Sequence, residues 1–196
     1  MAERVLLDAC VLVPISLCDV LLDLADAGLF DPAWSEAILD ETRRALTDKR
    51  GLAPERADRR IAQMTSAFPH AEVTGFERLI GRMANHPKDR HVLAAAVQGR
   101  CRTVVTANLS DFPLAALAPH GVDAAHPDEF LTGLWRRSQD QTLTALRRKV
   151  ALFKNPPMTL TGFAGVLEPL VPGFADLLAA ADEQPGEAVS ASGASV

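Results

Sequence analysis

Hydrophobic residues follow two spacings along the first 125 residues of the chain, and their alternation predicts the fold class. Short apolar or β-branched runs predict strands at 4–7, 30–34, 71–74, 103–106 and 122–125. The segments between these runs place hydrophobic residues three or four apart, which is typical of amphipathic helices. This pattern indicates an α/β fold in which a mostly parallel sheet is flanked by helices on both faces.

Proline and serine mark the residues at which most of these helices begin. Proline suits the first helical turn, and a serine oxygen can accept a hydrogen bond from an unpaired backbone N–H there. We therefore expect helices to begin at Pro14, Ser35, Pro54 and Pro87, and a further helix at 76–83. The segment directly after the first strand is expected to be a loop.

The pattern changes after His126, where no further strand is predicted. Helices are expected at 128–138, 141–153, 160–167 and 174–181, and the last residues are small, polar and aperiodic. The chain is therefore divided into an α/β domain at 1–125, an all-helical extension at 126–182 and a disordered tail at 183–196.

Composition places the chain among cytoplasmic proteins. Its 196 residues are 48% hydrophobic, which is enough for one core. Cys10, Cys18 and Cys101 are odd in number and lack metal-ligand spacing, so we expect reduced thiols. Asp8 interrupts the first apolar run, which excludes a signal sequence there, and no apolar stretch approaches the roughly 18 residues of a membrane helix. We expect no membrane partner.

The charge is unevenly distributed, although the net charge of -5 argues against a nucleic-acid partner. Residues 1–40 hold eight acids and one base, whereas 134–154 hold one acid and six bases. These six bases are Arg136, Arg137, Arg147, Arg148, Lys149 and Lys154, and a second basic group spans 43–60. Such asymmetry suits an acidic centre flanked by side chains that contact phosphate, and it also suits solvated helix faces.

Four carboxylates stand at the edges of apolar runs: Asp8, Glu41, Asp89 and Asp111. Carboxylates gathered near a core repel one another, and a hard divalent cation such as Mg²⁺ or Mn²⁺ relieves that repulsion. Asp8 follows the first strand, and Asn108 and Asp111 follow the strand at 103–106. Since ligands of parallel sheets bind outside the carboxyl ends of the strands, we expect these groups to converge there. The pattern indicates metal-dependent phosphodiester chemistry.

Three of these carboxylates also have a simpler interpretation. Asp89 suits the positive end of a helix dipole, and Asp111 suits a turn. Glu41 could be an exposed residue that pairs with Arg43 or Arg44.

Three motifs carry a resemblance to a known family: LLDACVLV at 6–13, KDRHVLAAA at 88–96 and VTANLSDFP at 105–113. With Glu41, which follows Trp34 and Ser35, they make the chain resemble the PIN-domain ribonucleases over residues 4 to about 125. Within that family it is similar to the toxin halves of VapBC toxin–antitoxin modules. The helical region after His126 looks like the extension that one branch of these toxins carries.

The resemblance implies a PIN-like fold and an endoribonuclease that uses Mg²⁺ or Mn²⁺. Its catalytic metal ligands would be Asp8, Glu41, Asp89 and Asp111, with Asn108 as an accessory ligand and Thr106 in support. It further implies an RNA substrate and a VapB-type antitoxin as partner, in a toxin that halts growth by cleaving cellular RNA. Homodimers are common among such toxins, and the apolar faces at 160–167 and 174–181 could cover a dimer surface, form an antitoxin groove or pack on the core.

One position departs from the family pattern, because Cys10 stands where Asn or Ser is usual. A thiol is a poor hydrogen-bond donor, so weak support of Asp8 is expected. Two alternatives to a toxin remain: a housekeeping PIN nuclease in RNA processing, and a catalytically silent PIN binding module. We expect the basic group at 134–154 to contact the substrate backbone outside the scissile site.

Overall fold

A sheet of four short parallel strands lies at the centre of the computed structural model, which describes residues 2–183. Its strands are β1 (Arg4–Leu7), β2 (Asp31–Ala33), β3 (Thr103–Val105) and β4 (Asp123–Ala125), in the order β2-β1-β3-β4. The register pairs Leu6 of β1 with Ala33 on one side and with Val104 on the other. The apolar side chains of β1 and β3 are buried, as expected for central strands covered on both faces.

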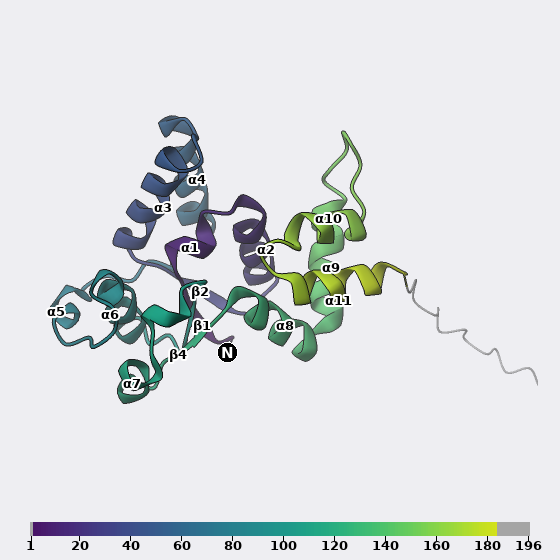
Figure 1. The fold of residues 1–196 in the computed structure, drawn as a ribbon. Helices are drawn as coiled ribbons and strands as arrows, with labels where there is room; N and C mark the ends of the chain where they lie inside the picture. Colours follow the sequence, from purple (N-terminus) through teal and green to yellow (C-terminus); the bar gives the residue numbers. More distant parts are fainter. Residues whose placement is uncertain (1, 184–196) are drawn as a thin grey trace, which may run out of the picture.

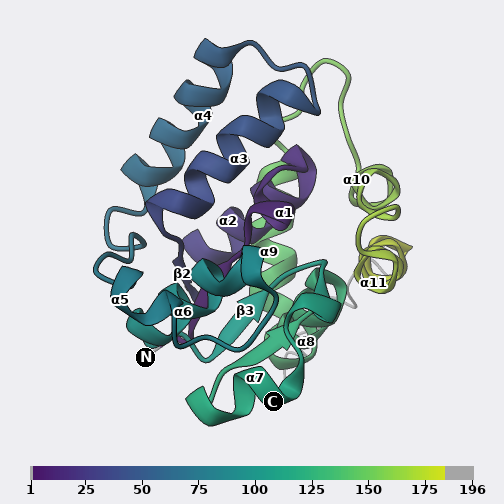
Figure 2. The same cartoon turned by 60° about the vertical axis from the view of Figure 1, so that its left-hand side comes forward.

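Helices flank this sheet and confirm the predicted fold class (Figures 1 and 2). Those before β4 are α1 (Ala9–Leu12), α2 (Ile15–Asp26), α3 (Glu36–Asp48), α4 (Pro54–Ala67), α5 (Glu77–Ile80), α6 (Arg90–Gln98) and α7 (Leu114–Leu117). Three 3₁₀ turns add to them: η1 (Pro87–Asp89), η2 (Leu109–Asp111) and η3 (Ala118–His120). In Figure 1, α3 and α4 stand together as a projection above the sheet.

Several predicted boundaries in this part were wrong. The segment after β1 is the short helix α1 and not a loop, because the carboxylate of Asp8 accepts a hydrogen bond from the backbone N–H of Ala9 and caps it. The run at 71–74 forms a single bridge, between Trp34 and Glu72, in place of a strand. The helix expected at 76–83 is only the one turn of α5, and α7 was not predicted.

The region after His126 is helical, as predicted. It comprises α8 (Pro127–Arg137), α9 (Gln139–Val150), α10 (Leu160–Leu167) and α11 (Pro172–Glu183). Helix α9 begins and ends earlier than expected, and α11 starts earlier and includes Glu183, which was assigned to the tail. The rest of the predicted disordered tail, 184–196, lies outside the described residues. Among residues 2–183, no helix combines the length and apolarity needed to cross a bilayer.

The C-terminal helices pack onto the same hydrophobic core as the sheet. The rings of Phe30 and Phe130 meet edge to face at 5.1 Å between centroids, and those of Trp135 and Phe174 do so at 6.2 Å. The carboxylate of Asp128 in α8 accepts hydrogen bonds from the backbone N–H groups of Gly173 and Phe174, at 3.1 and 2.8 Å, and thereby caps α11. The buried faces of α10 and α11 are therefore used within the molecule.

An ion-pair network also joins α9 to α2. The ammonium group of Lys149 lies 2.7 Å from a carboxylate oxygen of Asp23 and 3.7 Å from one of Asp19, and a guanidinium nitrogen of Arg60 lies 2.9 Å from Asp19. The Lys149 side chain is only 13% exposed. Its charge is thus directed at the acidic face of α2.

Candidate metal centre

Asp8 ends β1 and begins α1, and its carboxylate is held on several sides. The side chain is buried, and its Oδ1 accepts from the N–H of Ala9 at 2.7 Å. Its Oδ2 accepts from the hydroxyl of Thr106 at 2.7 Å and from the thiol of Cys10 at 3.2 Å. Because Thr106 directly follows β3, the neighbouring strand, the pairing of β1 with β3 sets this arrangement.

Cys10 supports Asp8 to a greater extent than its residue type suggested. Burial, reinforced by the negative charge of Asp8, raises the pKa of the Cys10 thiol to about 12. The thiol therefore stays protonated and donates a hydrogen bond to Asp8. The same sulfur accepts a hydrogen bond from the backbone N–H of Ala107 at 3.2 Å. The short hydroxyl bond from Thr106 supplies the stronger contact.

Glu41 enters the same space from the middle of α3 and is half-buried. It does not pair with Arg43, whose guanidinium contacts Asp40 at 2.7 Å and Asp58 at 2.8 Å. Its Oε1 lies 3.7 Å from Nε2 of His91, and Nδ1 of His91 donates to the carbonyl oxygen of Lys88 at 2.9 Å. The backbone carbonyl thus fixes the imidazole with Nε2 toward Glu41.

Asp89 and Asp111 lie at the ends of η1 and η2, together with a histidine that the sequence did not single out. His86, Asp89 and Asp111 each offer one ligand atom, and these atoms lie within 4.8 Å of one another. The backbone N–H of His86 donates to the carbonyl oxygen of Asp111 at 3.1 Å. The side chain of Asp89 makes no capping hydrogen bond to α6, so helix capping does not explain it. The His-x-x-Asp spacing at 86–89 was the available signal for His86.

Mutual repulsion links these acids. Burial, followed by the negative charges of Asp8 and Asp111, raises the pKa of Asp89. Burial also raises the pKa of Glu41; His91 and Arg44 oppose this rise, and Asp8 and Asp89 add to it. Asp8 and Asp111 therefore act electrostatically on Asp89, and Asp8 and Asp89 act on Glu41.

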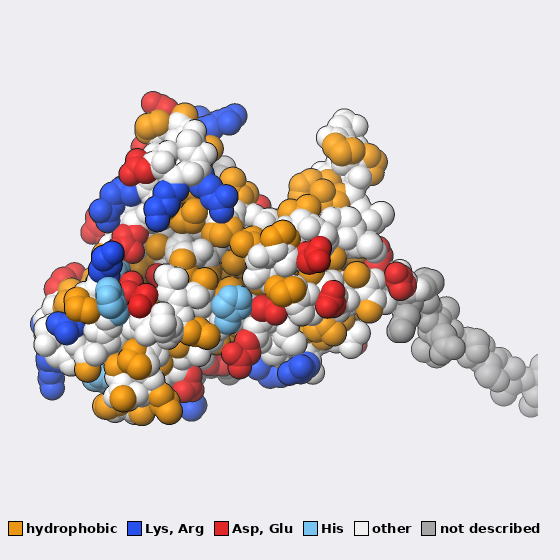
Figure 3. Space-filling model, in the orientation of Figure 1, with side chains coloured by type: hydrophobic (Ala, Val, Ile, Leu, Met, Phe, Trp, Pro, Cys, Tyr) orange, Lys and Arg blue, Asp and Glu red, His pale blue; other side chains and the backbone are white. Residues whose placement is uncertain are grey.

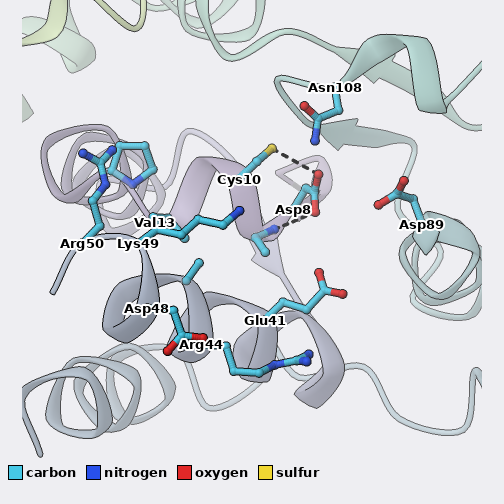
Figure 4. Close-up of a pocket in the computed structure, with 13 residues that line it drawn as sticks. Asp8, Cys10, Val13, Glu41, Arg44, Asp48, Lys49, Arg50, Asp89 and Asn108 are labelled. Atoms are coloured by element: carbon cyan, nitrogen blue, oxygen red, sulfur yellow. Dashed lines mark hydrogen bonds between the residues drawn. The ribbon is translucent and has the colours of Figure 1, made fainter. Parts of the chain in front are cut away.

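Three of the four carboxylates, those of Asp8, Glu41 and Asp89, line a cleft of about 690 Å³, whereas Asp111 lies beside Asp89 and is not part of the lining (Figure 4). Asp8, Glu41, Asp89 and Asn108 point into it, and Cys10 lies beside Asp8. Its positive lining consists of Arg44, Lys49 and Arg50, from α3 and the turn that follows it.

No residue of the basic group at 134–154 lines this cleft, so its expected contact with the substrate backbone outside the scissile site stays a prediction. Lys149 is engaged by Asp19 and Asp23, and Arg148 lies beside Ala27, at the opposite end of α2 from the cleft. The charge at the cleft belongs to the basic group at 43–60.

The donor set suits a hard divalent cation. Carboxylate and amide oxygens are the ligands that Mg²⁺ and Mn²⁺ prefer. A cation would offset both the burial and the repulsion between acids that raise the pKa values of Glu41 and Asp89. Asp8, Glu41, Asp89 and Asp111 would hold the ion, with Asn108 accessory. His86 adds a nitrogen donor, which transition ions accept more readily than Mg²⁺ does.

Comparisons with known proteins agree with this geometry. A profile of the PIN domain matches residues 4–110, and one described as the VapC50 C-terminal domain matches residues 127–180. A Mycobacterium tuberculosis protein named "Putative ribonuclease VapC50" is 40% identical over 112 residues. That alignment spans 57% of this chain and 64% of the relative, and no solved structure gave a significant match. Since the PIN domain profile covers more than half of its length, the chain belongs to the PIN-domain family.

Proposed function

We propose that this protein is a Mg²⁺- or Mn²⁺-dependent endoribonuclease and the toxin of a type II toxin–antitoxin system. The observation that carries the proposal is that Asp8, Glu41 and Asp89, from three separate segments, line one cleft, and that Asp111 lies beside Asp89, close enough to raise its pKa. The name of the mycobacterial relative and the match at 127–180 support the ribonuclease and VapC-type assignments.

A bound divalent ion supplies Lewis acidity at the scissile phosphate and lowers the pKa of a water molecule. The chain contributes the positions of the groups around it. Thr106 and Cys10 hold the Asp8 carboxylate, and His91 faces Glu41. Arg44, Lys49 and Arg50 place positive charge along an otherwise acidic cleft, so a phosphodiester backbone can approach.

The partners follow from the same proposal: an RNA substrate, a VapB-type antitoxin, and a second copy of the chain in a homodimer. We also propose a cytoplasmic location, and nuclease and extension domains at 1–125 and 126–182. The complete set of four carboxylates speaks against a silent binding module. Inhibition by a cognate antitoxin would separate a toxin from a housekeeping nuclease.

Cleavage of total cellular RNA by the purified protein tests the proposal. We expect cleavage with Mg²⁺ or Mn²⁺, none with EDTA, and none from Asp89→Asn, which keeps the shape of the side chain and removes its charge. Mapping the new 5′ ends would identify the target. Cleavage by Asp89→Asn at the rate of the unmodified protein would refute the assignment of the centre.

A further inference from the structure

A second cavity, of about 700 Å³, adjoins the metal centre and is walled by the C-terminal region. It lies between the start of α2, the end of α3, and the segment from the end of α9 through α10. Its lining is mainly apolar, and includes Ile15, Leu46, Leu52, Phe153, Phe163 and Val166. Figure 3 shows hydrophobic side chains along the hollow between the α3–α4 projection and the loop that joins α9 to α10. We call this cavity the apolar groove.

The apolar groove adjoins the acidic cleft, because Val13, Pro14 and Arg50 line both cavities and form their shared boundary. Arg44 and Lys49 lie on the cleft side, with the acidic Asp48 beside them, and Arg50 lies at the boundary. Positive side chains are therefore present on the cleft wall and at the mouth of the groove.

An exposed aromatic ring lies on the far wall of the groove. Phe153 is 40% exposed, whereas every other aromatic side chain among residues 2–183 is buried or partly buried. It packs against the buried ring of Phe163 at 6.2 Å between centroids, with an interplanar angle of 36°. Ile15 and Val166, also in the groove, are 51% and 47% exposed. Apolar surface left open beside a charged centre indicates a binding site.

We infer that the apolar groove receives an unpaired nucleobase of the RNA strand, next to the phosphate at the metal centre, and that Phe153 provides the stacking face. This inference rests on the proposed ribonuclease function. A strand whose phosphates follow Arg44, Lys49 and Arg50 places its next base at the groove, because Arg50 lies at the junction of the two cavities. Stacking on an aromatic ring with the backbone in a positive groove is a common mode of single-strand binding.

The inference narrows the substrate class. Bases inside an RNA duplex are paired and stacked on one another, and only a loop, bulge or end can turn a base into a side cavity. The substrate is therefore single-stranded at the cleavage site, and the C-terminal region takes part in selecting it.

Binding of two matched RNA probes tests this inference. The probes are a fluorescein-labelled single-stranded dodecamer of uridine and an abasic dodecamer with the same sugar–phosphate backbone. The full-length protein carries Asp89→Asn, so that neither probe is cut. We expect the uridine probe to bind about 5- to 100-fold more tightly than the abasic probe, as stacking of one base supplies.

In that background, Phe153→Ala should remove the preference for the uridine probe and leave affinity for the abasic probe unchanged. Phe153→Trp should keep the preference, because it keeps an aromatic face. Leu152→Ala is the matched control, since Leu152 is 78% exposed and does not line the groove.

The inference would be overturned if a folded Phe153→Ala protein still preferred the uridine probe, or if the Asp89→Asn protein bound both probes equally. Either result would leave a protein segment as the occupant of the apolar groove. Cleavage of total RNA by the protein without Asp89→Asn is a separate readout. Its failure would refute the proposed function without altering the preference measured by binding.

Discussion

Replacing Thr106 by valine should weaken metal binding more clearly than any other change outside the carboxylates. The Thr106 side chain is fully buried, and its hydroxyl donates to Oδ2 of Asp8 at 2.7 Å. The hydroxyl oxygen of Thr106 also accepts a hydrogen bond from the backbone N–H of Asn108 at 3.1 Å. Valine keeps the shape of the side chain and removes both hydrogen bonds, so Oδ2 of Asp8 retains only the contact with the Cys10 thiol.

The size of the effect follows from these contacts. A hydrogen bond to a charged group contributes about 1.5–3 kcal/mol, so we expect the free energy of unfolding to fall by about that amount. For a chain of this length the fall corresponds to a decrease in Tm of roughly 3–12 °C. Loss of a group that orients a ligand weakens metal binding by about 10- to 100-fold.

Calorimetric titration with Mn²⁺ measures the affinity, and thermal unfolding in EDTA measures the stability of the metal-free protein. Thr106→Ser is the matched control, because it keeps the hydroxyl and removes only the methyl group. We expect the serine variant to bind Mn²⁺ close to the affinity of the unmodified protein. If folded Thr106→Val also does so, then Thr106 does not hold Asp8 for metal binding.

Four further predictions concern other parts of the molecule. Because burial and the charges of Asp8 and Asp111 raise the pKa of Asp89, its ionised form disfavours folding. Asp89→Asn should therefore raise the free energy of unfolding in EDTA at pH 7, and this gain should vanish as the pH falls below the ordinary pKa of about 3.9. Denaturant unfolding at pH 7 and at a pH below that value checks this. Cys10→Ser should tighten Mn²⁺ binding because a hydroxyl is a better hydrogen-bond donor than a thiol. An unchanged affinity in the Mn²⁺ titration would show that the thiol already supports Asp8 well enough for metal binding. Asp128→Ala should lower the free energy of unfolding by about 1–2 kcal/mol through loss of the α11 cap, at unaltered metal affinity. Lys149→Gln should lower Tm, because it removes the ion pairs with Asp19 and Asp23. Although Lys149 lines the apolar groove, these acids already neutralise its charge, so the salt dependence of RNA binding should stay unchanged; a smaller salt slope would show that Lys149 contacts RNA.

The sequence could predict which side chains meet where strand ends determine it. Asp8 follows β1 and Asn108 follows β3, and neighbouring parallel strands bring their carboxyl ends together whatever the length of chain between them. Glu41 and Asp89 line the same cleft, and their role as metal ligands stays a prediction. Helix α1 was missed because four residues are too few to show a helical period.

The distribution of positive charge could not be predicted from the sequence. Basic residues in 134–154 and 43–60 look alike along the chain, and only packing shows that Lys149 faces α2 while Lys49 and Arg50 face the cleft. The spacing of His86 and Asp89 was a local signal, but the approach of His86 to Asp111 depends on the packing of two separate turns and could not be predicted from that spacing.

The continuous core has a consequence for how the molecule unfolds. Because the helices α8–α11 share one hydrophobic core with the sheet, with Phe130 against Phe30, the α/β part and these helices should lose their structure in a single cooperative transition. A protease that cuts the exposed segment between α9 and α10 would then nick the chain and leave its two pieces held together by the contacts of α10 and α11 with α8 and α9. The helices α8–α11 are thus an integral part of the fold, and their removal would expose core residues to aggregation.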